Sequence, residues 1–121
     1  MTDSSEIQVF LSVEFQKRVR TLAKRYRSIK ADLQPIIEQL QAGHTIGDQI
    51  AGTGSTVFKV RIKNTDIKRG KSAGYRLIYQ RRESTYVLLV LIYSKSDHDD
   101  VTGEEIRAAI AEFEQSEDSK L

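Results

Sequence analysis

Apolar and polar residues alternate along the middle of the chain, a pattern typical of half-buried β-strands. In residues 58–63 three apolar side chains alternate with three basic ones, Lys59, Arg61 and Lys63. Residues 75–80 alternate in the same way, with Tyr75 on one side and Arg76 on the other. Residues 86–93 are apolar almost throughout, as expected of a central strand covered on both faces. The pattern predicts three strands, two of which present basic side chains.

Before these strands the spacing of apolar residues changes to that of helices. Residues 7–11 form a short apolar strand, and from Ser12 to about residue 27 apolar positions recur at helical spacing among many basic residues. A second helix has its apolar stripe at residues 33–40. Asp32 is its expected N-cap, which places Pro35 in the first turn, and Gly43 closes the helix. The short link between the two helices predicts an antiparallel hairpin.

The remaining segments are predicted to be loops and one last helix. Residues 43–56 and 64–74 are expected to be loops, and Glu83 to Thr85 a tight hairpin turn. Thr102 and Glu105 form a capping box that opens the last helix, which ends in a charged tail from about residue 114. The order predicts an α+β fold in which the N-terminal strand and helical hairpin pack on an antiparallel sheet with a C-terminal helix. The basic side chains of the sheet are expected on the face that the hairpin leaves open.

Composition narrows the class of protein. A chain of 121 residues is expected to form one domain, spanning residues 1–121. It contains no cysteine, which excludes a disulfide framework and a thiolate metal site and is typical of a reducing cytosol. The first ten residues carry neither a basic segment nor a long apolar run, so we expect no signal peptide, no membrane span and a cytoplasmic location.

Charge is distributed unevenly although the net charge is only +2. Residues 17–82 carry sixteen Lys and Arg against four acids, whereas residues 83–121 carry three against ten. A basic middle favours a polyanionic partner, because a local positive field attracts phosphates whatever the net charge is.

Three segments carry a resemblance to a known family. The run GKSAGYRLIYQ at residues 70–80 follows the alternating KVRIK at residues 59–63, and IYSKSDHDDVT at residues 92–102 ends the last strand. Together they resemble the RelE/ParE superfamily of toxins from type II toxin–antitoxin systems, most closely its RelE-like and HigB-like branch. The resemblance covers residues 10–113 and implies a toxin that cleaves mRNA on the ribosome and is inhibited by a cognate antitoxin. It also implies operator DNA binding only through the antitoxin complex, and cleavage without metal or cofactor, by attack of the ribose 2′-OH on the adjacent phosphate.

The resemblance assigns roles to individual residues. Lys59 and Arg61 match paired basic positions, with Arg61 suited to hold phosphate because arginine stays protonated. Arg76 matches an arginine that contacts the scissile phosphate, and Lys95 a basic residue after the last strand. The family's tyrosine falls on Thr102 and a further arginine on Ser96, so His98 becomes the candidate acid or base. Four further basic residues are expected to steer RNA: Lys63, Lys68, Arg69 and Lys71.

Plainer interpretations compete with these roles. The basic strand face is also what a solvated surface looks like, and the basic first helix is equally a solvated face, a ribosome contact or an antitoxin-binding surface. Asp97, Asp99 and Asp100 lack the spacing of a calcium loop and are interpreted as caps of the last helix. Three tyrosines are interpreted as packing residues: Tyr75, Tyr79 and Tyr93.

Two other functions remain open. A ParE-like protein would bind DNA gyrase without cleaving RNA, which the missing tyrosine favours and the retained basic cluster disfavours. A degenerate member would only bind its antitoxin.

Overall fold

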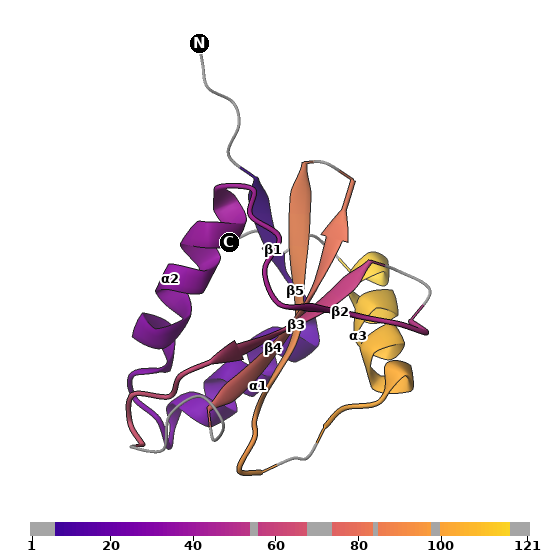
Figure 1. Cartoon of the computed structure of the whole chain (residues 1–121). Coiled ribbons are helices and arrows are strands. Elements are labelled where there is room, and N and C mark those ends of the chain that lie inside the picture. The colour runs from indigo at the N-terminus through magenta and orange to yellow at the C-terminus, as the bar shows by residue number, and fades with distance from the viewer. Residues whose placement is uncertain (1–6, 54–55, 68–73, 84, 98–99, 117–121) are drawn as a thin grey trace.

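The computed structural model describes residues 7–53, 56–67, 74–83, 85–97 and 100–116 (Figure 1). The elements follow the predicted order, with one strand added: β1 (Gln8–Leu11), α1 (Val13–Ala23), α2 (Ile29–Gln41), β2 (Asp48–Ile50), β3 (Val57–Ile62), β4 (Tyr75–Arg82), β5 (Tyr86–Ser94) and α3 (Gly103–Gln115). The α+β fold predicted from the sequence is confirmed.

The five strands form one mixed sheet in the order β1-β5-β4-β3-β2. β1 runs parallel to β5, so the sheet is not purely antiparallel as predicted. The loop predicted at residues 43–56 contains β2, which pairs with β3 from Asp48 opposite Lys59 to Ile50 opposite Val57. Three residues are too few to show a period, and β2 forms because the edge of β3 offers its backbone groups as partners. The tight turn at Glu83 is confirmed by the pairing of Arg82 with Tyr86.

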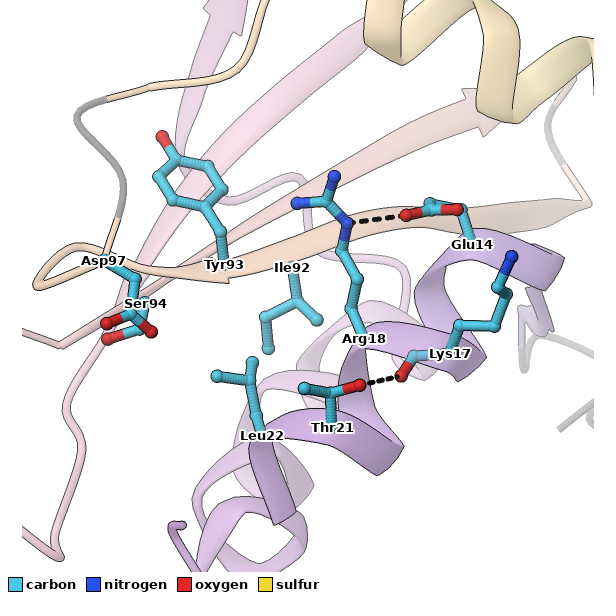
Figure 2. Close-up of a pocket in the computed structure, with 9 residues that line it drawn as sticks. All are labelled: Glu14, Lys17, Arg18, Thr21, Leu22, Ile92, Tyr93, Ser94 and Asp97. Carbon is cyan, nitrogen blue, oxygen red and sulfur yellow. Dashed lines mark hydrogen bonds and ion pairs between the residues drawn. The ribbon is translucent and has the colours of Figure 1, made fainter. Parts of the chain in front are cut away.

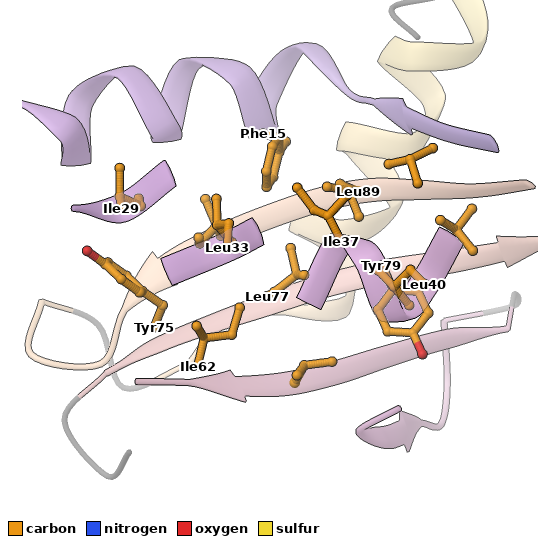
Figure 3. Close-up of a cluster of buried hydrophobic side chains, with 14 of the residues drawn as sticks. Phe15, Ile29, Leu33, Ile37, Leu40, Ile62, Tyr75, Leu77, Tyr79 and Leu89 are labelled. Carbon is orange, nitrogen blue, oxygen red and sulfur yellow. The ribbon is translucent and has the colours of Figure 1, made fainter. Parts of the chain in front are cut away.

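Each face of the sheet carries its own apolar core. α1 and α2 cover one face, where Leu33, Leu77 and Leu89 belong to a single buried cluster (Figure 3). α3 covers part of the other face, packing Ile106 and Ile110 against Ile78, Leu88 and neighbouring residues. In Figure 1, α2 is seen to the left of the sheet and α3 to the right. As predicted, the basic side chains of the sheet lie on the face away from α1 and α2.

A β-bulge in β5 changes which way the end of that strand faces. Ile78 pairs with Leu91 but Tyr79 pairs with Leu89, so Val90 is the extra residue. Before the bulge Leu89 faces α1 and α2; after it Ile92 does. Tyr93 is therefore turned to the opposite face, where strict alternation would not place it.

Buried Ser12 fixes this bulge. Its hydroxyl donates to the Val90 carbonyl at 2.7 Å and accepts the Phe15 N–H at 2.9 Å, so one side chain caps α1 and pairs with the bulge. The predicted start of α1 at Ser12 is confirmed.

The sequence prediction for α2 is wrong at the start of the helix and confirmed at its end. The helix begins at Ile29 rather than after Asp32, so Pro35 lies inside the helix, beyond its first turn. Tertiary contacts explain the early start: Asp66 accepts the Ser28 N–H at 2.9 Å, and Asp32 instead accepts from Thr65. At the other end Gly43 has φ +93°, and its N–H and that of His44 donate to Leu40 and Gln39. This is a Schellman motif, so Gly43 closes the helix as predicted.

α3 begins with the predicted capping box of Thr102 and Glu105. It continues through Gln115, so the predicted charged tail begins later than residue 114. Glu114 is helical and pairs with Arg82 at 2.8 Å.

Candidate functional site

A row of three polar side chains crosses the sheet on the face that α3 only partly covers. Arg61 on β3 is opposite Arg76 on β4, and Arg76 is opposite Tyr93 on β5. Like charges directly opposite each other destabilise a sheet. A pair of opposed arginines is therefore the arrangement expected where an anion binds between them.

This row forms the floor of a polar cavity of about 170 Å³. Its lining residues come from three strands of the sheet, from β2 at its edge and from the segment that leads to α3: Asp48, Lys59, Arg61, Arg76, Tyr93, Lys95 and Asp100. Four of the seven are basic and two are acidic. The cavity has room for a group the size of a phosphate.

Arg76 is the most buried cation of the cavity, with 7% of its surface exposed. Its guanidinium donates to the Tyr75 carbonyl at 3.2 Å, which orients the side chain along β4. Gly74 permits this register, because a methyl group there would collide with the Ile62 carbonyl oxygen on β3. The glycine of the Gly-Tyr-Arg segment is thus needed for the close approach of the two strands.

Tyr93, Asp100 and Lys59 form a connected polar group at one side of the cavity. The Tyr93 hydroxyl donates to Asp100 Oδ1 at 2.8 Å, and Lys59 Nζ lies 3.3 Å from the same oxygen. Burial raises the pKa of Tyr93, and its hydrogen bond to Asp100 raises the pKa further, so the phenol stays protonated. Partial burial alone would raise the pKa of Asp100, but donors from Tyr93, Val101 and Lys59 outweigh it and lower the pKa below its usual value.

The structure brings together four of the residues predicted for the site. Lys59, Arg61, Arg76 and Lys95 all line the cavity. Lys63 is exposed just beyond the end of β3 and does not line it. Four other predicted residues lie outside the described residues: His98, Lys68, Arg69 and Lys71.

Sequence reasoning missed three residues of the cavity: Tyr93, Asp100 and Asp48. Tyr93 is buried as predicted, but its hydroxyl reaches the cavity because of the bulge at Val90. The predicted capping role is wrong for Asp97, which pairs with Arg25 at 2.8 Å, and for Asp100, because Thr102 caps α3. An acid cluster immediately after a strand that carries a buried tyrosine was the available signal for Asp100.

A larger cavity of about 310 Å³ lies between α1 and β5 (Figure 2). Tyr93 lines both cavities, but Leu22 and Ile92 form part of the wall of this one. Two of its charged side chains, Arg18 and Glu14, pair with each other at 2.8 Å within α1. Because these charges already compensate each other, the smaller cavity is the better candidate for binding an anion.

In the described part of the chain, no three His, Cys, Asp or Glu side chains are placed so that they could hold a metal ion. No helix in the described ranges has the length and apolar character needed to cross a membrane.

The family model described as the RelE toxin of the RelE/RelB toxin–antitoxin system matches residues 7–119. The comparison with curated proteins found no match.

Proposed function

Because the chain belongs to the RelE toxin family, it is the toxin of a toxin–antitoxin system, and we propose that it is an endoribonuclease that cleaves mRNA. The family implies a cognate antitoxin as its partner. The observation that carries the proposal is the convergence of Lys59, Arg61, Arg76 and Lys95 on one cavity of phosphate size.

In the proposed reaction the ribose 2′-OH attacks the adjacent phosphate, and the charge that develops on phosphorus must be stabilised. Arg61 and Arg76, opposed across β3 and β4, suit the non-bridging oxygens because guanidinium binds them through two parallel N–H groups. Lys59 and Lys95 also line the cavity and add positive charge to it. Fixed cations in such a site stabilise the transition state without having to reorganise.

We also propose that cleavage takes place on the translating ribosome in the cytoplasm, and that operator DNA is bound only through the antitoxin complex. The support for a large RNA partner is the outer face of α1 and the turn after it, where five basic residues are exposed: Lys17, Arg20, Lys24, Arg25 and Arg27. A face of this kind favours RNA over a small-molecule substrate.

The first prediction tests cleavage by means of the two opposed arginines. Expression of the wild-type chain without antitoxin is expected to arrest translation, and primer extension should map cuts within mRNA. Arg61→Ala and Arg76→Ala should each lower the cleavage rate by about 10²-fold, the usual effect of removing one donor to a developing charge. Arg61 is exposed, so its variant separates loss of charge from loss of folding.

Arg107→Ala is the matched control, because Arg107 is exposed on α3 and donates to the Gly52 carbonyl outside the cavity. It should cleave like the wild type. Translation arrest that persists unchanged in Arg61→Ala and Arg76→Ala would contradict the proposal. Inhibition of DNA supercoiling with intact RNA would indicate a gyrase-binding toxin, and normal growth with tight antitoxin binding would indicate a degenerate member.

A further inference from the structure

The carboxylate of Asp100 is the most connected acid of the cavity. Oδ1 accepts three donors: the Tyr93 hydroxyl at 2.8 Å, the Val101 N–H at 2.9 Å and Lys59 Nζ at 3.3 Å. Among the described residues, Oδ2 accepts from one donor, Lys59 Nζ at 3.4 Å. A carboxylate oxygen has two lone pairs, so Oδ2 keeps capacity to accept a further hydrogen bond that Oδ1 has already used.

Its position also suits a proton acceptor. The Asp100 side chain is 59% exposed, so a ligand can reach it, yet it faces a cavity whose other walls carry four cations. A phosphodiester held between Arg61 and Arg76 would have its neighbouring ribose within the same small cavity. Lysine and arginine side chains are protonated at neutral pH and are poor bases.

We propose that Asp100 is the general base of RNA cleavage, and that Tyr93 and Lys59 are positioning residues that hold its carboxylate; this inference rests on the proposed function. In the step, the ribose O2′–H bond breaks and its proton passes to Asp100 Oδ2 while O2′ bonds to phosphorus. The bond from phosphorus to O5′ breaks, and O5′ takes a proton from the Lys95 ammonium. The products are a 2′,3′-cyclic phosphate and a 5′-OH, and solvent returns both side chains to their starting protonation states.

The surrounding groups keep Asp100 ionised. It is faced by Lys59 and Arg61 from β3, by Arg76 from β4, by Tyr93 from β5, by Lys95 just after β5, and by Asp48 from β2. Donors from Tyr93, Val101 and Lys59 outweigh the effect of burial and lower the Asp100 pKa. The carboxylate is therefore ionised at neutral pH, in the form that can accept a proton.

Asp48 is the other carboxylate of the cavity and the internal alternative. It lies on the short edge strand β2, directly opposite Lys59. The lone tyrosine of the cavity donates its hydroxyl to Asp100 and not to Asp48. Of the two acids, Asp100 is thus the one whose carboxylate is oriented by the Tyr93 hydroxyl.

The second prediction is that Asp100→Asn lowers single-turnover cleavage by about 10²-fold or more, the usual contribution of a general base. The variant should bind a 2′-deoxy analogue, which cannot be cleaved, at least as tightly as the wild type does, because the substitution removes the negative charge of Asp100 from a site that binds an anion. Asp97→Asn is the matched control: it makes the same change in the same segment, at a residue that pairs with Arg25 outside this cavity. It should cleave like the wild type.

The pH profile gives a readout that a merely structural role would not move. With Asp100 as base, the wild-type rate should stay level as the pH falls from 8 to about 5, because a carboxylate loses its charge only below that range. A histidine base would instead give a loss of rate below about pH 6.5. A loss of cleavage rate below about pH 6.5 would overturn the proposal.

Tyr93→Phe keeps the carboxylate but removes the donor of its shortest hydrogen bond. It should lower the rate less than Asp100→Asn does, and it serves as the second variant if Asp100→Asn is unfolded by circular dichroism. If folded Asp100→Asn cleaves RNA at a rate similar to that of the wild type, this inference is overturned but the proposed function still stands. Absence of cleavage by the wild type on free and ribosomal RNA would overturn the proposed function itself.

Discussion

Tyr75 and Tyr93 show how two tyrosines at neighbouring positions of one sheet acquire different environments. Both are almost fully buried. The Tyr93 hydroxyl donates to Asp100 in the polar cavity, whereas the Tyr75 hydroxyl has no hydrogen-bond partner among the described residues. Burial raises the pKa of Tyr75, and the charges of Asp32 and Asp66 raise it further. Tyr75→Phe would therefore remove no hydrogen bond of the described residues.

The third prediction follows from Tyr75. A folded-state pKa above the unfolded value of about 10 means that its contribution to stability is full below pH 10 and is lost as the pH rises above it. Tyr75→Phe cannot ionise, so its free energy of unfolding should decline less than that of the wild type between pH 7 and about 10.5. At pH 7 it should equal or exceed the wild-type value, because an unpaired buried hydroxyl is removed.

Urea denaturation at the two pH values checks this. Tyr79→Phe is the comparison, since the Tyr79 hydroxyl donates to the Ile46 carbonyl at 2.7 Å. That variant should be less stable than the wild type at pH 7. Equal destabilisation by both substitutions would contradict the assignment of Tyr75 as unpaired.

At the scale of elements, the site depends on where α1 begins and where β5 bulges. Ser12 links the two, because its hydroxyl caps α1 and donates to the Val90 carbonyl. The start of α1 was predictable from the sequence, since a serine ahead of an amphipathic run is a local signal. The bulge and the pairing of β2 were not, because both depend on partners far away in the chain.

The fourth prediction compares two helix caps. Thr102→Ala removes the exposed side chain that caps α3, and this should lower the free energy of unfolding by about 1 kcal/mol. Ser12→Ala removes a cap and also leaves the buried Val90 carbonyl without this donor, which should add about 1–3 kcal/mol. Ser12→Ala should also lower cleavage in the fraction that remains folded, because the bulge directs Tyr93 into the cavity.

Thermal and urea denaturation measure both costs, and cleavage is measured below the unfolding transition. Equal destabilisation by Ser12→Ala and Thr102→Ala would show that the bulge does not depend on Ser12. Full cleavage by Ser12→Ala would show that the direction of Tyr93 is set by other contacts.

At the scale of the molecule, opposite charges are separated along the chain. The basic middle contributes three cations of the cavity, Lys59, Arg61 and Arg76, and the exposed basic face of α1, while α3 carries acidic residues in its first turn at Glu104 and Glu105. The net charge of +2 therefore understates the local positive field. The cavity is expected to hold RNA by its phosphates.

The fifth prediction concerns salt. Binding of an uncleavable RNA should weaken between about 50 and 200 mM salt, and Arg61→Ala should reduce the slope of log affinity against log salt by about one. Arg20→Ala removes an exposed charge on α1, away from the cavity, and should leave the slope for a short RNA unchanged. Fluorescence anisotropy across a salt series measures both. An equal reduction in the two variants would indicate that α1 binds the same RNA.

The sequence by itself determined the class of the fold and the four cations of the site. Alternation placed Lys59 and Arg61 on one face of β3, and the Gly-Tyr-Arg segment marked Arg76, because these patterns are local and repeat within a few residues. Only the tertiary structure placed Tyr93 and Asp100 beside these cations. The bulge at Val90 turned Tyr93 to the cavity, and the segment before α3 returned Asp100 to it, because side chains far apart in the chain meet only where the sheet's register brings them together.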